Sequence, residues 1–199
     1  MNIIMLSGSR NREGRTARVL EAIGKGFLSA GGNSEIIFLP ELNVERCRQC
    51  NPDGWGICRN EHRCIIEDDF NSVVTKLEAA DVAVFASPVY FLEMSESIRT
   101  FLERLRRVRG PARPGPGGVR NPARIGAIPA IGVCLAGGGG GGAVNTCMML
   151  EKIIQECGYD MVDMIPLRRQ NLEFKLPILE LTGEWLATKP SSGQGDPHK

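Results

Sequence analysis

Short apolar runs alternate along this chain with segments whose apolar residues recur at helical spacing. We predict five strands, over residues 2–6, 34–39, 81–86, part of 125–136, and 159–167. Helices are predicted over about 15–28, from Asp68 or Asp69, and over about 95–107, 143–157 and 178–187. Strands that alternate with helices in this way are typical of parallel βαβ units. The pattern therefore predicts an α/β fold, a doubly wound sheet of five parallel strands with the order 2-1-3-4-5.

Two prolines set expected strand boundaries. Pro129 is expected to start the fourth strand or to lie at a bulge, because an interior strand position needs its amide hydrogen. Pro88 comes directly after the third strand, where we expect it to force a turn. That turn would leave Tyr90 and Phe91 at the edge of the sheet.

One domain is predicted over residues 1–189, with a cysteine-rich loop at 47–64 inserted after the second strand. The segment 109–122 is rich in proline and glycine and is expected to be an irregular excursion. Residues 190–199 are expected to form a disordered tail. The N-terminal apolar run lacks the flanks of a signal peptide, and no segment approaches the ~20 apolar residues of a membrane span. These features predict a cytoplasmic protein without a membrane partner.

Charge gives no general reason to expect nucleic-acid binding. The chain has 24 basic and 23 acidic residues, a net charge of +1. Within the predicted helix at 95–107 and just beyond it, Arg99, Arg106 and Arg109 interleave with apolar residues at helical spacing. This spacing predicts an amphipathic helix with one solvated basic face. We therefore expect any ligand to bind at a local site.

Ligands of doubly wound sheets bind beyond the carboxyl ends of the strands, where the winding direction switches. The loop after the first strand, SGSRNREGRT, combines hydroxyls, glycines and arginines ahead of a helix. Free amides, hydroxyls and guanidinium groups at a helix N-terminus favour a phosphate site. The loop lacks the GK[ST] ending of a P-loop and the GxGxxG of dinucleotide sites. An ordinary helix start with solvated arginines is the alternative.

Two further loops at the same edge have unusual compositions. SPVYFLEMSES follows the third strand and places two aromatic residues there, although such residues are also common in cores. Six glycines at 137–142 follow the fourth strand and would let a ligand approach the backbone closely, unless they form only a flexible loop. Together the three loops favour a mononucleotide that carries a large planar ring.

The stretches GSRNREGRT and SPVYFLEMSESIRTFLER, with the glycine run, resemble the flavodoxin-like NAD(P)H-dependent FMN reductases over about residues 2–165. The resemblance implies bound FMN whose phosphate is held by Ser9, Arg10, Arg15 and Thr16. It also implies that Pro88, Val89, Tyr90 and Phe91 lie along the isoalloxazine ring, with Gly137 and Gly138 opposite. No catalytic side chain is expected, because the flavin carries the chemistry. The resemblance also implies NAD(P)H or a ferredoxin-like electron donor, a small-molecule or protein acceptor, and a homodimer or homotetramer.

Four of the seven cysteines follow the second strand with the spacing C-x2-C-x7-C-x5-C. This is neither the spacing of a zinc ribbon nor that of a bacterial ferredoxin. In a reducing compartment, clustered cysteines more often bind metal or do redox chemistry than form disulfides. Cysteine number and position resemble the iron-sulfur flavoproteins, whose middle spacing is shorter. The resemblance implies a 4Fe-4S cluster on Cys47, Cys50, Cys58 and Cys64, with zinc or unligated redox-active thiols as the alternatives.

The leading hypothesis is an FMN-dependent oxidoreductase that passes electrons between the flavin and a 4Fe-4S cluster. One alternative is a cluster-free NAD(P)H-dependent reductase of quinones, azo compounds or flavin. Another is a non-catalytic electron carrier or a thiol- or metal-based sensor. The same fold can host all three functions. The other three cysteines, Cys134, Cys147 and Cys157, are predicted to be small buried side chains.

Overall fold

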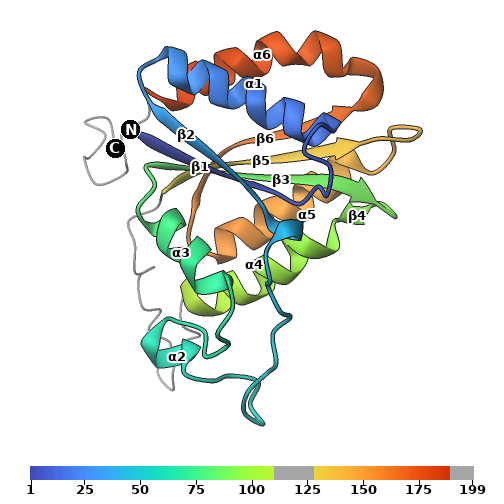
Figure 1. The fold of residues 1–199 in the computed structure, drawn as a ribbon. Helices are drawn as coiled ribbons and strands as arrows, with labels where there is room; N and C mark the ends of the chain where they lie inside the picture. Colours follow the sequence, from blue (N-terminus) through green and yellow to red (C-terminus); the bar gives the residue numbers. More distant parts are fainter. Residues whose placement is uncertain (110–127, 189–199) are drawn as a thin grey trace, which may run out of the picture.

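A six-stranded sheet, with five parallel strands and one short antiparallel strand, lies at the centre of the molecule (Figure 1). The computed structural model describes residues 1–109 and 128–188. The strands are β1 (Asn2–Ser7), β2 (Asn33–Phe38), β3 (Val82–Tyr90), β4 (Glu93–Met94), β5 (Pro129–Ala136) and β6 (Asp160–Arg168). The parallel strands have the order β2-β1-β3-β5-β6, and the short β4 pairs antiparallel with β3. Counted along the chain without β4, this is the predicted order 2-1-3-4-5, so the doubly wound α/β fold is confirmed.

Helices cover both faces of the sheet (Figure 1). One face packs against α1 (Arg15–Ser29) and α6 (Leu172–Leu186), and the other against α3 (Phe70–Glu78), α4 (Glu96–Arg109) and α5 (Ala143–Glu156). The shorter elements are η1 (Leu39–Glu41), α2 (Cys58–Glu61) and η2 (Arg169–Asn171). The helices after β1 and β3 therefore lie on opposite faces, which makes the carboxyl ends of these two strands the switch point.

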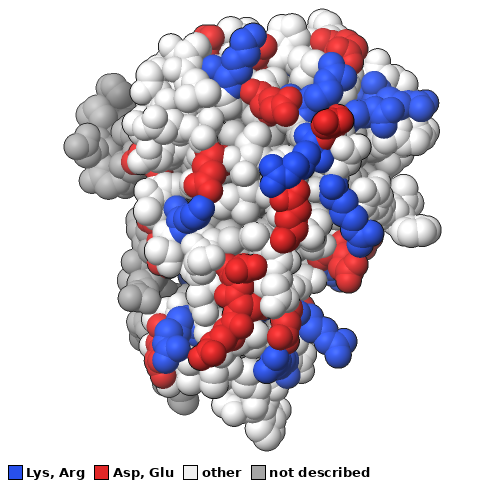
Figure 2. Space-filling model, viewed as in Figure 1, with Lys and Arg blue, Asp and Glu red and all other residues white. Residues whose placement is uncertain are grey.

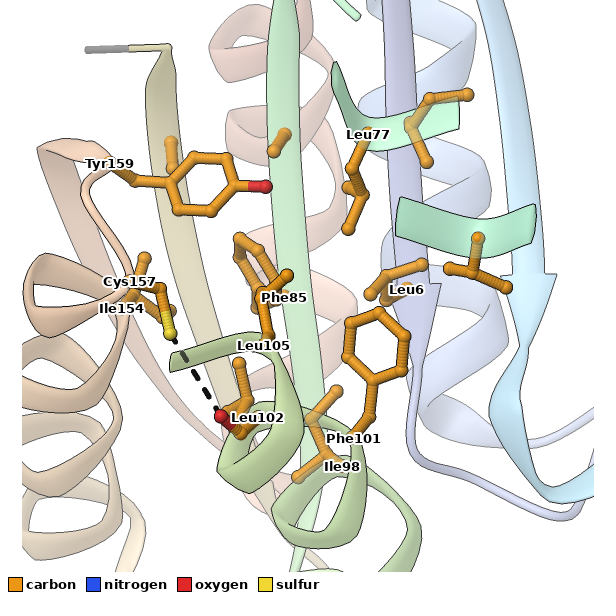
Figure 3. Close-up of a cluster of buried hydrophobic side chains, with 14 of the residues drawn as sticks. Leu6, Leu77, Phe85, Ile98, Phe101, Leu102, Leu105, Ile154, Cys157 and Tyr159 are labelled. Atoms are coloured by element: carbon orange, nitrogen blue, oxygen red, sulfur yellow. Dashed lines mark hydrogen bonds between the residues drawn. The ribbon is translucent and has the colours of Figure 1, made fainter. Parts of the chain in front are cut away.

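A core of buried apolar side chains fills the space between the sheet and α3, α4 and α5 (Figure 3). Phe85 of β3 meets the ring of Tyr159 edge-on at 5.2 Å between centroids. Phe101 of α4 packs against Phe70 at 5.1 Å. Burying each large apolar side chain contributes about 1.5–3 kcal/mol. Cys134, Cys147 and Cys157 are buried, as predicted.

The third strand is longer than predicted. We expected Pro88 to end it, but β3 continues through Pro88 to Tyr90, and the turn comes at Phe91 and Leu92. The pairing of β1 with β3 ends at Ala86, so no β1 carbonyl needs the amide hydrogen that Pro88 lacks. Beyond that point β3 continues beside β5. Pro129 starts β5, as predicted, with a register shift just after it.

The last helix begins six residues earlier than predicted. We expected it to start after Pro177, whereas α6 begins at Leu172 and contains Pro177. Pro177 is exposed, while Leu172, Leu179 and Leu186 of the same helix are buried. Burial of this apolar stripe stabilises a helix across the proline and outweighs the lost hydrogen bond.

Two predicted segments fall outside the described residues. Helix α4 runs to Arg109, and the rest of the predicted excursion 109–122 lies outside the described residues, as does the predicted tail 190–199. Among the described helices, none is long and apolar enough to cross a membrane. Basic and acidic side chains are interspersed on the face that Figure 2 draws, and the described ion pairs include Arg18 with Glu173 and Lys76 with Glu35.

Candidate functional site

A cavity of about 360 Å³ opens at the carboxyl ends of β1 and β3. We call it the switch-point cavity; it is lined by Gly8, Arg10, Leu39, Pro40, Leu42, Val44, Tyr90, Ser95, Glu96, Ser97 and Thr100. The segment after β2 supplies apolar side chains, and the start of α4 supplies mainly hydroxyls. Its volume lies within the range of about 300–1,000 Å³ typical of small-molecule sites. Both its position and its size suit a bound ligand.

The loop between β1 and α1 is folded by its own short side chains. The Gly8 amide donates to the Ala86 carbonyl at 2.8 Å, which fixes the loop against β3. The Asn11 amide donates to Ser9 Oγ at 3.2 Å, and the Glu13 amide donates to Asn11 Oδ1 at 2.9 Å. Gly14 precedes α1 in an extended conformation, and no side chain caps the helix. The first amides of α1 are therefore available to an anion.

The three arginines of this loop differ in their partners. Arg12 forms a bidentate pair with Glu41 and stacks on Phe38 at 4.9 Å from its ring centroid. The hydrogen bond from Arg12 lowers the pKa of Glu41. Arg10 is mostly exposed and has only a loose ion pair, 3.9 Å from Glu96. Arg15 has no ion-pair partner within residues 1–109 and 128–188. Arg10 and Arg15, the two that the resemblance selects, are thus the ones available to a ligand.

The predicted ring-binding stretch lies at the end of β3. Pro88 is buried, Val89 is half-buried and Tyr90 is exposed. Phe91 is fully exposed, and both Phe91 and Leu92 have positive φ angles, of 51° and 65°. Left-handed backbone at a residue other than glycine costs about 1–3 kcal/mol and is common at binding sites. An exposed apolar side chain on a strained turn is typical of a ligand contact.

The glycine run after β5 lies against this turn. A Cβ at Gly142, whose φ is +83°, would lie 3.0 Å from the Cα of Leu92. Thr146 Oγ1 donates to the Leu92 carbonyl at 3.0 Å. At the other end of the run, a Cβ at Gly137 would lie 3.9 Å from Nη1 of Arg15, and one at Gly138 would meet open space. The run therefore extends from the start of α1 to the turn after β3.

The structure gathers the ten predicted flavin residues at one edge of the sheet, but only Arg10 and Tyr90 line the switch-point cavity. The sequence analysis missed the hydroxyls of Ser95, Ser97 and Thr100. Ser97 Oγ donates to the Gly8 carbonyl at 3.2 Å, and the Ser95 amide donates to Ser87 Oγ at 2.9 Å. The sequence Ser95-Glu96-Ser97 could have indicated these hydroxyls, because it directly follows a loop at the switch point.

The four clustered cysteines line one small hollow of about 20 Å³ beneath α4. This cysteine hollow is lined by Cys47, Arg48, Cys50, Gly54, Gly56, Ile57, Cys58, Cys64, Ile65, Ile66, Arg104, Arg107 and Val108. Four soft thiols match an iron-sulfur cluster or zinc in number and in kind. Among the described residues, however, no three His, Cys, Asp or Glu side chains converge as metal ligands. The donor set fits such a group, and its coordination geometry is not formed.

Arg104, which lines the cysteine hollow, forms a buried ion pair with Asp68. Arg104 of α4 donates to both carboxylate oxygens of Asp68, at 2.6 and 2.9 Å, and to the Glu45 carbonyl at 3.0 Å. Both side chains are almost fully buried. Burial is the largest influence on each group and disfavours its charge, but their hydrogen bonds prevail, so the pKa of Asp68 is lowered and that of Arg104 is raised. The guanidinium also lies 4.1 Å from the ring centroid of Phe70.

The prediction of one solvated basic face on this helix is wrong in part. Arg99 and Arg106 are exposed, as predicted, but Arg109 is only 4% exposed. Its guanidinium lies 4.4 Å from the ring centroid of Tyr159. An arginine stem is apolar and its planar head can stack on an aromatic ring, so helical spacing alone does not show which arginines face solvent.

Curated proteins of similar sequence include iron-sulfur flavoproteins. An iron-sulfur flavoprotein of Methanocaldococcus jannaschii is 30% identical over 138 residues, which is 69% of this chain and 65% of that protein. One of Methanosarcina thermophila is 26% identical over 104 residues, 52% of each chain. This chain thus spans less than two thirds of the length of these curated relatives.

Solved structures share the fold at low sequence identity. An NAD(P)H:quinone oxidoreductase from Methanothermobacter marburgensis matches with a TM-score of 0.72 and 20% identity, over 92% of this chain and 98% of that one. A flavodoxin from the domain Archaea matches with a TM-score of 0.55 and 15% identity, over 95% of this chain and 100% of that one. The fold is therefore flavodoxin-like, as the resemblance implied. The sequence model of the NADPH-dependent FMN reductase family matches residues 1–170, and the chain belongs to that family.

Proposed function

We propose that this chain is an FMN-dependent oxidoreductase that passes electrons between FMN and a 4Fe-4S cluster bound by Cys47, Cys50, Cys58 and Cys64. Membership of the FMN reductase family supports the flavin. The names of the curated relatives support the cluster. When bound, FMN supplies hydride and electron chemistry, and the protein places it and sets its surroundings.

The position of α4 is the observation that carries this proposal. Ser97 and Thr100, in its first turns, line the switch-point cavity, whereas Arg104 and Arg107 line the cysteine hollow. With a rise of 1.5 Å per residue, the α-carbons of Thr100 and Arg107 are about 10 Å apart along the helix. Leu42 and Val44, which are five and three positions before Cys47, also line the switch-point cavity. The switch-point cavity and the cysteine hollow therefore share one helix and one connecting segment, which supports electron transfer between groups bound at the two sites.

In this proposal the phosphate of FMN binds at the N-terminus of α1. The uncapped amides of the helix and the hydroxyls of Ser9 and Thr16 would donate hydrogen bonds to it, and the guanidinium groups of Arg10 and Arg15 would also balance its charge. Residues 88–91 would hold the isoalloxazine ring on one side, and Gly137 and Gly138 on the other. These glycines would let the ring approach the backbone, because neither carries a side chain.

The electron donor in this proposal is NAD(P)H or a ferredoxin-like protein, and the acceptor is a quinone-type molecule or a protein. The family and the quinone oxidoreductase among the solved relatives support the nicotinamide and quinone halves. The exposed Tyr90 and Phe91 are suited to contact such a planar partner, or a second subunit of a homodimer or homotetramer.

A cluster-free NAD(P)H-dependent FMN reductase is the second candidate. The small hollow and the absence of converging ligands among the described residues favour it. The two candidates differ after anaerobic reduction. Full reduction with excess dithionite should bleach the flavin and also produce the electron paramagnetic resonance signal of a reduced iron-sulfur cluster. Bleaching without that signal, in protein already supplied with iron and sulfide, would establish the cluster-free candidate.

Replacement of Arg15 with methionine should weaken FMN binding about tenfold, because it removes one charge-assisted hydrogen bond to the phosphate. Riboflavin, which has no phosphate, should bind wild type and Arg15→Met with equal affinity. Quenching of flavin fluorescence on titration with apoprotein measures both affinities. Arg12→Met is the matched control, since Arg12 is already engaged by Glu41. If Arg15→Met and Arg12→Met bind FMN equally well, Arg15 does not hold the phosphate.

A further inference from the structure

The connection between Cys50 and Cys58 folds back on itself. The Gly54 amide donates to the Asn51 carbonyl at 2.7 Å, and the Trp55 amide donates to Asp53 Oδ1 at 3.0 Å. Gly54 has a φ of +78°, and a Cβ at Gly56 would lie 3.0 Å from the Cβ of Cys50. This close return explains how Cys50 and Cys58 line one hollow although seven residues separate them.

Arg107 of α4 holds the folded connection in place. Its Nη1 donates to the Gly54 carbonyl at 2.5 Å, and its guanidinium lies 5.0 Å from the ring centroid of Trp55. Arg59 lies near the same ring, at 5.8 Å. A hydrogen bond and a stacking contact from one planar group constrain both the position and the orientation of the turn.

Among the described residues, no carboxylate balances the positive charge of Arg107. Three arginines line the cysteine hollow. Arg48 is paired with Glu45 at 2.7 Å and Arg104 with Asp68 at 2.6 Å, whereas Arg107 has no ion-pair partner within the described part of the chain. The Nε atoms of Arg104 and Arg107 are both buried and lack a hydrogen-bond partner there. Buried donors normally have partners, so this wall of the hollow, with two unpartnered Nε donors and one unpaired charge, is suited to an anionic group.

We propose that Arg107 is a positioning residue that clamps the connection between Cys50 and Cys58 and balances the negative charge of a thiolate-bound metal group in the cysteine hollow. This inference rests on the proposed cluster. Hydrogen bonds and charge around the sulfur atoms are among the features that set the potential of iron-sulfur clusters. Residues in contact with ligands also affect metal affinity, typically by 10- to 100-fold.

The test compares Arg107→Met with Arg106→Met, a matched control on the exposed side of the same helix. Each protein is reconstituted anaerobically with ferrous iron and sulfide. Iron loss to a chelator and the midpoint potential of the iron-sulfur signal are then measured. Arg107→Met should lose iron about 10- to 100-fold faster than wild type, and its potential should become more negative because a nearby positive charge is gone. Arg106→Met should match wild type in both measurements.

Equal iron loss and equal potential in the two variants would overturn the role of Arg107 while leaving the proposed function intact. A wild-type chain that takes up no iron and sulfide would overturn the cluster, and this inference with it. If Arg107→Met does not fold, Arg107→Lys decides. Lysine keeps the charge but lacks the planar group that stacks on Trp55. The midpoint potential of the iron-sulfur signal in Arg107→Lys should therefore stay near the wild-type value, while iron loss accelerates. Wild-type iron loss in Arg107→Lys would refute the clamp.

Discussion

Asp68→Ala should lower the free energy of unfolding by about 3–5 kcal/mol, because it leaves the buried guanidinium of Arg104 without its counter-charge. The bidentate pair is almost fully buried, and Asp68 also accepts hydrogen bonds from the Glu45 and Phe70 amides. Urea unfolding followed by circular dichroism measures the change. Glu173→Ala breaks the exposed pair with Arg18 and should lower the free energy of unfolding far less, because water and salt screen an exposed ion pair.

Removal of both partners should cost less than removal of one. In Asp68→Leu with Arg104→Met, no unpaired charge is left in the interior, so part of the stability should return. A loss below about 1 kcal/mol in Asp68→Ala would mean that the pair does not hold this region together.

Acid should remove the same stabilisation. The folded-state pKa of Asp68 lies below its ordinary value, so the pair contributes its full stability above the unfolded-state pKa of about 3.9. That contribution is lost as the pH falls through the lower folded-state pKa. Wild type should therefore lose this contribution below about pH 4, and Asp68→Asn, which cannot titrate there, should show a flatter dependence.

Replacement of any one of Cys47, Cys50, Cys58 and Cys64 with alanine should abolish stable assembly of the cluster. Three thiolates leave one iron of a cubane without its protein ligand. Iron and acid-labile sulfide per chain after reconstitution are the measurement. FMN content should not change, because the flavin residues lie in other loops.

Cys134→Ala is the matched control for these variants. Cys134 is buried in β5 and lies outside the cysteine hollow, so its replacement should leave the iron content at the wild-type value. A clustered-cysteine variant that kept its full iron content would remove that residue from the ligand set.

Much of the fold could be predicted from the sequence, because its signals are local. Apolar runs and helical spacing located the five parallel strands and their order, and the missing amide hydrogen of Pro129 located the start of β5. The same reasoning was wrong where a distant partner decides. Pro88 stays in β3 because β1 has already ended, and Pro177 stays in α6 because buried leucines on both sides of it stabilise the helix.

The candidate site shows the same division. Motifs and family resemblance marked the loops after β1, β3 and β5 and the four cysteines. The hydroxyls at the start of α4, the buried pair of Arg104 with Asp68 and the contacts of Arg107 were not predicted. The partners of Ser97, Arg104 and Arg107 are 36 or more positions away in the chain, and spacing along one helix cannot indicate such a partner.

The cofactor content of the purified chain tests the central claim most directly. After anaerobic reconstitution with FMN, ferrous iron and sulfide, followed by gel filtration, the chain should retain one FMN and a full 4Fe-4S cluster. The absorption spectrum should then show flavin bands above broad iron-sulfur absorption. Flavin bands with no retained iron or sulfide would contradict the account and leave a cluster-free FMN reductase.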